Sequence, residues 1–247
     1  MDKENQNEPS TIDEILRKIE RKANTGEYLY RGEPEHYQGD PYNGKVSSKL
    51  YRDFLEREDF DVEAEHFDIE VVQEAMLSAA RRFFRKTVQD FEILAEIQHY
   101  GGKTNLIDFT TDYLIALFMV CDREEPLSKD GRIILQGKEL IDPYIAEPYE
   151  PINRVIAQKS VFVRHPDGFV LPNEEDIISI PADLKKPLRK HLERYHGVSA
   201  ETVYNDLHGF IKNQDIHLEN YVDFYTGSTE VQKGDSENGD PEEISTL

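Results

Sequence analysis

The sequence contains one cysteine and no tryptophan among its 247 residues. A single cysteine excludes an internal disulfide and any zinc site that is built from several cysteines. This residue, Cys121, lies in an apolar segment that is typical of a buried helix. We therefore expect Cys121 to be part of the core and not a nucleophile.

Long apolar runs are also absent. No uninterrupted apolar stretch reaches the length that a membrane-spanning helix needs. Residues 1–8 contain no apolar region of the kind found in a secretory signal. The sequence therefore predicts a cytoplasmic protein that does not bind membranes.

Basic residues are outnumbered by acidic ones. There are 29 lysines and arginines against 50 aspartates and glutamates, which gives a formal net charge of −21 at pH 7. A surface of that sign repels phosphate backbones, which argues against general nucleic-acid binding. A local basic site for one small, nucleotide-like anion is compatible with this charge. So is a protein partner that binds the acidic surface or tail.

Apolar residues still make up 38% of the chain and aromatic residues 10%, so a sizeable core can form. Strand-like and helical segments alternate without repeating as βαβ units. This pattern predicts an α+β fold with a mostly antiparallel or mixed sheet flanked by helices. We expect an N-terminal tail and helix over residues 1–26, a domain over 27–215, and an acidic segment over 216–247 that is disordered from about residue 226.

The spacing of apolar residues places individual elements along the chain. Helices are expected over 11–24, over 69–100 with a break near Thr87, and over 113–121, 184–195 and 199–212. Strands are expected at 28–30, 132–136, 153–163 with a bend at 158–160, and 176–180. Ser47 or Ser48 either caps a short helix that starts there or contacts a ligand.

Polar residues crowd the segment from Gln98 to Leu117, which ends in an apolar helix. Polar groups beside a core element must be hydrogen-bonded or take part in chemistry. One interpretation is structural: Thr110 or Asp112 caps the helix, and Asp108 holds the loop. The other is a functional site, which we favour for the cluster as a whole. Its polar members are His99, Lys103, Thr104, Asn105, Asp108, Thr110, Thr111 and Asp112.

An arginine follows the first strand of the expected sheet. Arg31 comes directly after Tyr28, Leu29 and Tyr30, which favour a strand. Its guanidinium suits a phosphate or carboxylate, although an ordinary ion pair would explain the same residue. Gly32 either stops the strand or lets a ligand approach the backbone.

The order of these motifs resembles the FRG domain family, which is named for an aromatic-Arg-Gly motif. The resemblance covers about residues 27–215. In two positions the chain departs from the family pattern: Asn105 stands where arginine is usual, and Ser160 where a small residue such as glycine is common. If that arginine binds a phosphate, this chain is expected to bind it more weakly. The matching segments are Tyr30-Arg31-Gly32, Ser47 to Arg52, Gln98-His99-Tyr100-Gly101, Thr104 to Thr110, Ala116-Leu117, and Arg154, Ala157, Gln158 and Phe162.

The chain is also similar, more distantly, to ADP-ribosyltransferases, in which an early strand-end arginine, a Ser/Thr strand and a Gln/Glu-x-Glu element follow in order. Arg31, Thr110-Thr111 and Gln158 to Ser160 occur in that order. The resemblance implies that NAD is a substrate, with Arg31 on its phosphate or ribose, Thr110 near the nicotinamide and Gln158 at the catalytic end. Ser160 replaces the catalytic glutamate, so Asp108 or Glu96 could substitute only if folding places it there.

Three functions are compatible with the sequence. The first is an NAD-using ADP-ribosyltransferase-like toxin or defence effector, and the second is a non-catalytic ligand- or protein-binding module. The third is a hydrolase or nuclease that uses His99 and Asp108 as an acid–base pair, or His99 with Glu96 as a metal site. A histidine that hydrogen-bonds at a helix end is a simpler explanation, so no resident metal is expected. The pocket is expected to contain Arg31, Gln98, His99, Thr104, Asp108, Thr110 and Gln158, with Gly32 and Ser48 as further ligand contacts.

Overall fold

The computed structural model describes residues 10–64, 66–122, 128–149, 151–212, 214 and 218. The chain divides into two compact units, residues 1–205 and 206–247. Residues 1–9 of the expected N-terminal tail and the disordered tail expected from about residue 226 lie outside the described residues. The described part of the second unit contains the short helix α9 (Leu207–Lys212).

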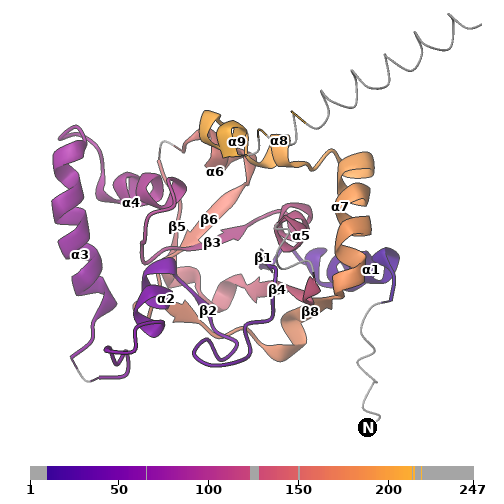
Figure 1. Ribbon diagram of the computed structural model, residues 1–247, viewed down its shortest axis with the longest axis horizontal. Coiled ribbons are helices and arrows are strands. Elements are labelled where there is room, and N and C mark those ends of the chain that lie inside the picture. Colours follow the sequence, from indigo (N-terminus) through magenta and orange to yellow (C-terminus); the bar gives the residue numbers. More distant parts are fainter. Residues whose placement is uncertain are drawn as a thin grey trace, which may run out of the picture. The chain divides into compact units, whose positions relative to one another are not determined.

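The first unit is built on a six-stranded antiparallel sheet, in which the strand order is β5-β6-β3-β1-β4-β8 (Figure 1). Every pairing within it is antiparallel, which confirms the expected α+β fold. A smaller two-stranded sheet joins β2 (Val46–Ser47) to β7 (Phe169–Val170). The strands of the main sheet are β1 (Tyr28–Glu33), β3 (Ile107–Thr110), β4 (Gly131–Gly137), β5 (Ile145–Ala146), β6 (Ser160–Val163) and β8 (Ile177–Ile180).

Helices flank this sheet, and most begin where the sequence predicts. Side chains of Thr11, Ser48, Asp68, Asp112 and Ser199 cap the helices that follow them. The helical pattern over 69–100 divides into two helices with the expected break between them. None of the described helices is long and apolar enough to cross a membrane. The helices of the first unit are α1 (Ile12–Ala23), α2 (Lys49–Leu55), α3 (Ile69–Ala80), α4 (Asp90–His99), α5 (Tyr113–Cys121), α6 (Asn153–Ala157), α7 (Ala182–His196) and α8 (Ala200–Val203).

Helix α5 packs directly on strand β1. A Cβ atom placed on Gly32 would lie 1.8 Å from the carbonyl oxygen of Ala116, so no larger residue fits between the two backbones. The strand continues through Gly32 to Glu33, and Gly32 therefore does not stop it. Cys121 is completely buried at the end of α5, where burial raises the pKa of its thiol to about 12. Its expected place in the core is confirmed.

Two sequence predictions are wrong. Residues 153–157 form helix α6 and not the first half of a strand, because the Ile152 carbonyl accepts from the Ile156 N–H at 3.1 Å and only one face is covered: Val155 is buried, whereas Ile156 is exposed. The helix expected over 199–212 is interrupted after Val203. The side chain of Asp206 accepts a hydrogen bond from the Gly209 N–H and so begins a new helix.

Candidate functional site

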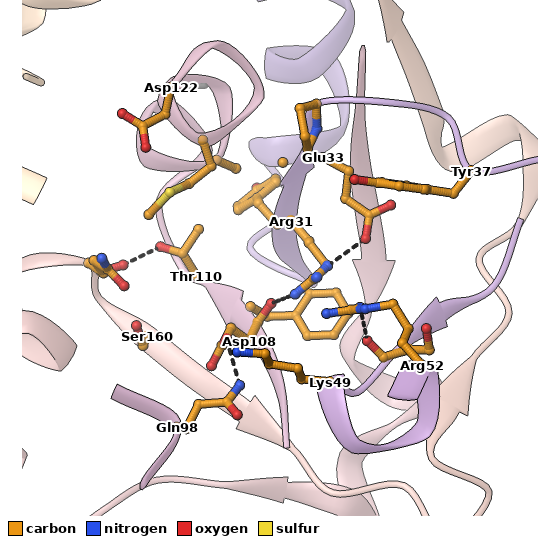
Figure 2. A pocket seen from close by; sticks show the side chains of 18 of the residues that line it. Arg31, Glu33, Tyr37, Lys49, Arg52, Gln98, Asp108, Thr110, Asp122 and Ser160 are labelled. Carbon is orange, nitrogen blue, oxygen red and sulfur yellow. Dashed lines mark hydrogen bonds and ion pairs between the residues drawn. The ribbon is translucent and has the colours of Figure 1, made fainter. Parts of the chain in front are cut away.

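A cavity of about 710 Å³ opens at the junction of β1 and β3 (Figure 2). Among the described residues, these strands are paired only at Tyr30 and Thr110. Beyond that pair the two backbones are joined through a side chain, because Nη1 of Arg31 donates a hydrogen bond to the carbonyl oxygen of Asp108 at 2.7 Å. The side chains that follow Tyr30 and precede Thr110 therefore line a polar opening in the sheet.

Arg31 and Glu33 line the cavity and form an ion cluster with Arg132, which is not a lining residue. Oε1 of Glu33 accepts from Arg31 at 2.8 Å, and Oε2 accepts from Nε and Nη2 of Arg132 at 2.8 and 2.6 Å. The Arg132 side chain is only 1% exposed. Burial alone would raise the pKa of Glu33, but Arg31 and Arg132 outweigh it and lower that pKa. Burial likewise disfavours the charge on Arg31, and Glu33 outweighs it and raises the Arg31 pKa. Glu33 therefore pairs with both arginines and fixes their direction.

Asp108 projects into the cavity from β3 and is held by an amide. Its Oδ2 accepts from Nε2 of Gln98 at 2.8 Å, and the side-chain oxygen of Gln98, Oε1, accepts from the hydroxyl of Thr104. The Asp108 side chain is open to the cavity, yet protein surrounds that space, and this burial raises the pKa of Asp108 against the opposing effects of Arg31, Gln98 and Arg52. Asp108 is therefore a carboxylate whose pKa is set by burial and by the neighbouring Arg31, Gln98 and Arg52, inside a cavity large enough for a ligand.

The opposite end of the cavity is formed where β3 meets the turn before β6. The Thr110 hydroxyl donates to the carbonyl oxygen of Gln158 at 2.8 Å, and the Thr110 and Ser160 backbones are paired. Between Gln158 and Ser160, Lys159 adopts a left-handed backbone with φ of 47°, which is uncommon for a residue other than glycine. The side chain of Lys159 pairs with Asp112 at 2.8 Å. This tight turn brings Gln158 and Ser160 to the cavity.

One face of helix α2 supplies much of the charge. Lys49, Arg52, Asp53 and Glu56 follow helical spacing and all line the cavity. Arg52 donates to the carbonyl oxygen of Ser47. Burial, and then the nearby charge of Arg31, lowers the Arg52 pKa, so the two guanidinium groups repel each other in this space.

Positive and negative side chains are balanced around the cavity although the whole chain is strongly acidic. The basic lining residues are Arg31, Lys45, Lys49, Arg52 and Lys103, and the acidic ones are Glu33, Asp53, Glu56, Asp108 and Asp122. Five of each sign give a local balance near zero, against −21 for the chain. An anionic ligand would neutralise the repulsion between the two arginines, so the cavity is suited to phosphate or another anion.

Most of the predicted site residues meet at this cavity. Arg31, Gly32, Gln98, Asp108, Thr110 and Gln158 line it. Ser48 and Thr104 are buried beside it: Ser48 caps α2, and Thr104 donates to Gln98. His99 is not a lining residue and lies at the end of α4 with its ring 5.1 Å from that of Tyr100. Glu96 also does not line the cavity. Of Asp108 and Glu96, the two carboxylates that could substitute for the glutamate replaced by Ser160, folding therefore brings Asp108 to the site.

Asn105 lies away from the cavity. Its side chain donates to Glu70 and to the carbonyl oxygen of His165, and its backbone N–H donates to Gln73. The expectation that an asparagine at this position weakens phosphate binding by direct contact is therefore not supported by its location. Asn105 instead joins β3 to helix α3.

Several lining residues were missed from the sequence. Lys49 and Arg52 belong to a segment that matched the family pattern. Their i, i+3 spacing places both on one face of a helix and could have identified them as a pair. Tyr37 and Tyr42 come from an irregular loop over residues 34–45, which has no periodicity that could place them. Within the described ranges no group of three His, Cys, Asp or Glu residues could hold a metal ion.

Comparison with known proteins gives one match. The family model described as FRG domain matches residues 26–129. This range contains β1, α2, β3 and α5, and all lining residues named above except Gln158 and Ser160. No curated protein and no solved structure matches the chain.

Proposed function

Since residues 26–129 form an FRG domain, we propose that its cavity binds NAD and that the protein is an ADP-ribosyltransferase-like enzyme, with the toxin or defence role that this class suggests. One observation carries the proposal. Arg31, Thr110 and Gln158, which occur in the order expected for such enzymes, are separated by 79 and 48 positions (110 − 31 and 158 − 110) and line the same cavity.

The binding role falls to the arginines and to Lys49. Arg31 is oriented by Glu33 and by the Asp108 carbonyl, so its guanidinium is fixed before a ligand arrives. Arg52 and Lys49 line the same space from α2. A diphosphate placed among them would receive charge-assisted hydrogen bonds and relieve the repulsion between Arg31 and Arg52.

The chemical role falls to the opposite end. In the proposed reaction the bond between the ribose C1′ and the nicotinamide nitrogen breaks, and its electron pair leaves with neutral nicotinamide. The acceptor nucleophile then bonds to C1′ and gives up its proton. Asp108, in its ionised form, stabilises the positive charge that develops on the ribose and accepts that proton. Thr110, with the Gln158 carbonyl that it contacts, borders the space for the leaving group.

A second candidate is a non-catalytic nucleotide-binding module. Ser160 favours it, because a hydroxyl stands where these enzymes carry a glutamate and Asp108 has to supply the carboxylate from a neighbouring strand. Both candidates use the same phosphate contacts. They differ in whether bound NAD is consumed.

Ligand binding and turnover can be measured separately. Thermal shift and calorimetry with NAD, ADP-ribose and nicotinamide should show that NAD and ADP-ribose raise the melting temperature of the wild type but not of Arg31→Ala. Arg57→Ala is the matched control, because Arg57 is an exposed arginine outside the cavity. Nicotinamide release, followed by chromatography, should occur in the wild type and be lost in Asp108→Asn.

The outcomes separate the candidates. Binding of NAD without nicotinamide release would replace the enzyme by the binding module. If neither NAD nor ADP-ribose binds at millimolar concentration, the NAD-using enzyme and the nucleotide-binding module would both be overturned.

A further inference from the structure

Two tyrosines line the cavity from the loop over residues 34–45. The rings of Tyr37 and Tyr42 lie 5.5 Å apart at an interplanar angle of 73°. In this edge-to-face pair one ring supports the other and leaves aromatic surface beside the cationic side chains. A cavity that bound only phosphate or a sugar phosphate would gain little from such a surface, whereas a nucleobase stacks on it.

The loop is held in a defined shape. Tyr37 has a left-handed backbone with φ of 50°, and its carbonyl accepts from the Gly44 N–H at 2.8 Å. The carbonyl of Gly44 accepts from Nη1 of buried Arg132 at 3.1 Å, and the Tyr42 hydroxyl donates to Glu56. Tyr37 is thereby connected, through Gly44 and Arg132, to the ion cluster that orients Arg31, whereas Tyr42 is held by Glu56. Such positioning before binding is typical of a ligand site.

The tyrosines and the reactive end lie on different sides of the arginines. Figure 2 shows Arg31 between Thr110 and Tyr37, with Arg52 on the side of Tyr37. Tyr37 is near enough to Arg31 and Arg52 to affect the proton affinity of both. A ligand that spans the cavity would therefore place an anionic group at the arginines, one end at Thr110 and the other end at Tyr37.

We infer that Tyr37, supported by Tyr42, forms a stacking site for the base of a nucleoside diphosphate whose phosphates bind Arg31 and Arg52. This inference rests on the proposed function for its orientation: the adenine of NAD stacks on Tyr37, and the nicotinamide reaches Thr110. The stacking site would make the cavity prefer nucleoside diphosphates over other diphosphates. The phosphate contacts alone cannot make this distinction, because they do not recognise the base.

Calorimetry with two pairs of probes tests the inference. ADP and inorganic pyrophosphate differ by the nucleoside, and NAD and nicotinamide mononucleotide differ by the adenylate end. The variants are Tyr37→Leu, which removes the ring, and Tyr37→Phe, which keeps it. Neither replacement is β-branched, so both place similar demands on the left-handed backbone.

The expected pattern is specific to stacking. Wild type and Tyr37→Phe should bind ADP at least about tenfold more tightly than pyrophosphate, and Tyr37→Leu should lose about tenfold in ADP affinity. Binding of pyrophosphate should change by less than about twofold in Tyr37→Leu. NAD binding should fall about as much as ADP binding, whereas binding of nicotinamide mononucleotide should not change.

Each contrary result has a distinct meaning. Equal affinities for ADP and pyrophosphate in the wild type, or an equal loss for both in Tyr37→Leu, would overturn the stacking site. An equal loss for NAD and nicotinamide mononucleotide would overturn the assignment of adenine to Tyr37. If ADP shows the expected pattern but NAD does not bind, the stacking site stands and the proposed NAD-using function fails.

Discussion

The cavity has two walls that hold their charges in different ways. The sheet wall consists of Arg31, Glu33, Asp108 and Thr110 on β1 and β3, and the helix wall consists of α2 with the loop over residues 34–45. In the sheet wall, Glu33 is 4% exposed and is paired with an arginine that is almost completely buried. In the helix wall, the Lys103–Asp53 ion pair that extends it has side chains that are 48% and 31% exposed.

This difference separates two roles. The Glu33–Arg132 pair behind the sheet wall is part of the folded core, so the loss of Glu33 leaves Arg132 buried without compensation. In the helix wall, Lys49, Glu56 and the Lys103–Asp53 pair are exposed or half-buried and contribute little to folding, but the lysines can attract an anion. Glu33 is therefore expected to act mainly on stability, and the helix wall, together with Arg31, mainly on affinity.

The largest effect is expected from Glu33→Ala. The substitution leaves Arg132 buried without its carboxylate and should lower the free energy of unfolding by about 3–5 kcal/mol. Because the pKa of Glu33 is lowered in the folded protein, the stabilisation is present at neutral pH and is lost as pH falls through the folded pKa. Urea unfolding at pH 7 measures it. Lys103→Ala in the helix wall is the control and should cost less than about 1 kcal/mol; similar losses for both variants would contradict the separation of roles.

A smaller loss is expected from Gly32→Ala. The added methyl would meet the Ala116 carbonyl, so β1 or α5 must shift, and the free energy of unfolding should fall by about 1–3 kcal/mol. Gly39→Ala adds the same methyl where no atom lies within 4 Å and should change stability by less than about 0.5 kcal/mol. Unfolding curves of the two variants that coincide would mean that β1 and α5 are not as closely packed as described.

Arg52→Ala tests the helix wall. It should weaken ADP-ribose binding by about tenfold, because one charge-assisted contact to the diphosphate is lost, while leaving most of the stability intact. Calorimetry at two salt concentrations should also show a weaker salt dependence than in the wild type. Unchanged affinity would remove Arg52 from the ligand contacts.

The smallest effect is expected from Asp108→Asn. Burial raises the pKa of Asp108, so the folded protein binds this proton more tightly than the unfolded chain does. Stability therefore declines as pH rises from the unfolded pKa, about 3.9, through the folded pKa. The variant should lack this decline and gain less than about 1 kcal/mol at pH 7, because the cavity is open to solvent. Wild type and variant should agree near pH 3; a loss of stability at pH 7 would contradict the expected sign.

The two walls also differ in how far the sequence predicted them. Arg31 and Asp108 lie beside recognisable strand and cap signals, which place them by local periodicity. The antiparallel sheet and the caps at Ser48 and Asp112 were predictable for the same reason. The position of Asn105 was not, because its partner Gln73 is 32 residues away and only tertiary packing decides which side it faces.

The conformation of the loop over residues 34–45 was even less predictable from the sequence than the position of Asn105. Tyr37 is placed by a left-handed backbone and by a bond from Gly44, whose own carbonyl is bound by Arg132. Arg132 lies 88 residues further along the chain than Gly44. No periodic pattern within the loop encodes that contact, so its contribution to the cavity follows only from the assembled sheet.

The contact at Gly32 restricts how the cavity can diversify. Since β1 and α5 pack backbone to backbone at Gly32, no larger side chain fits between the strand that carries Arg31 and the helix that carries Met119 without displacing one of them. Changes in ligand size are therefore expected to come from the loop over residues 34–45, since surface loops as a class accept changes in length more readily than packed elements do. Replacing the part of this loop that Arg132 and Glu56 do not hold is the direct route to altering what the domain binds.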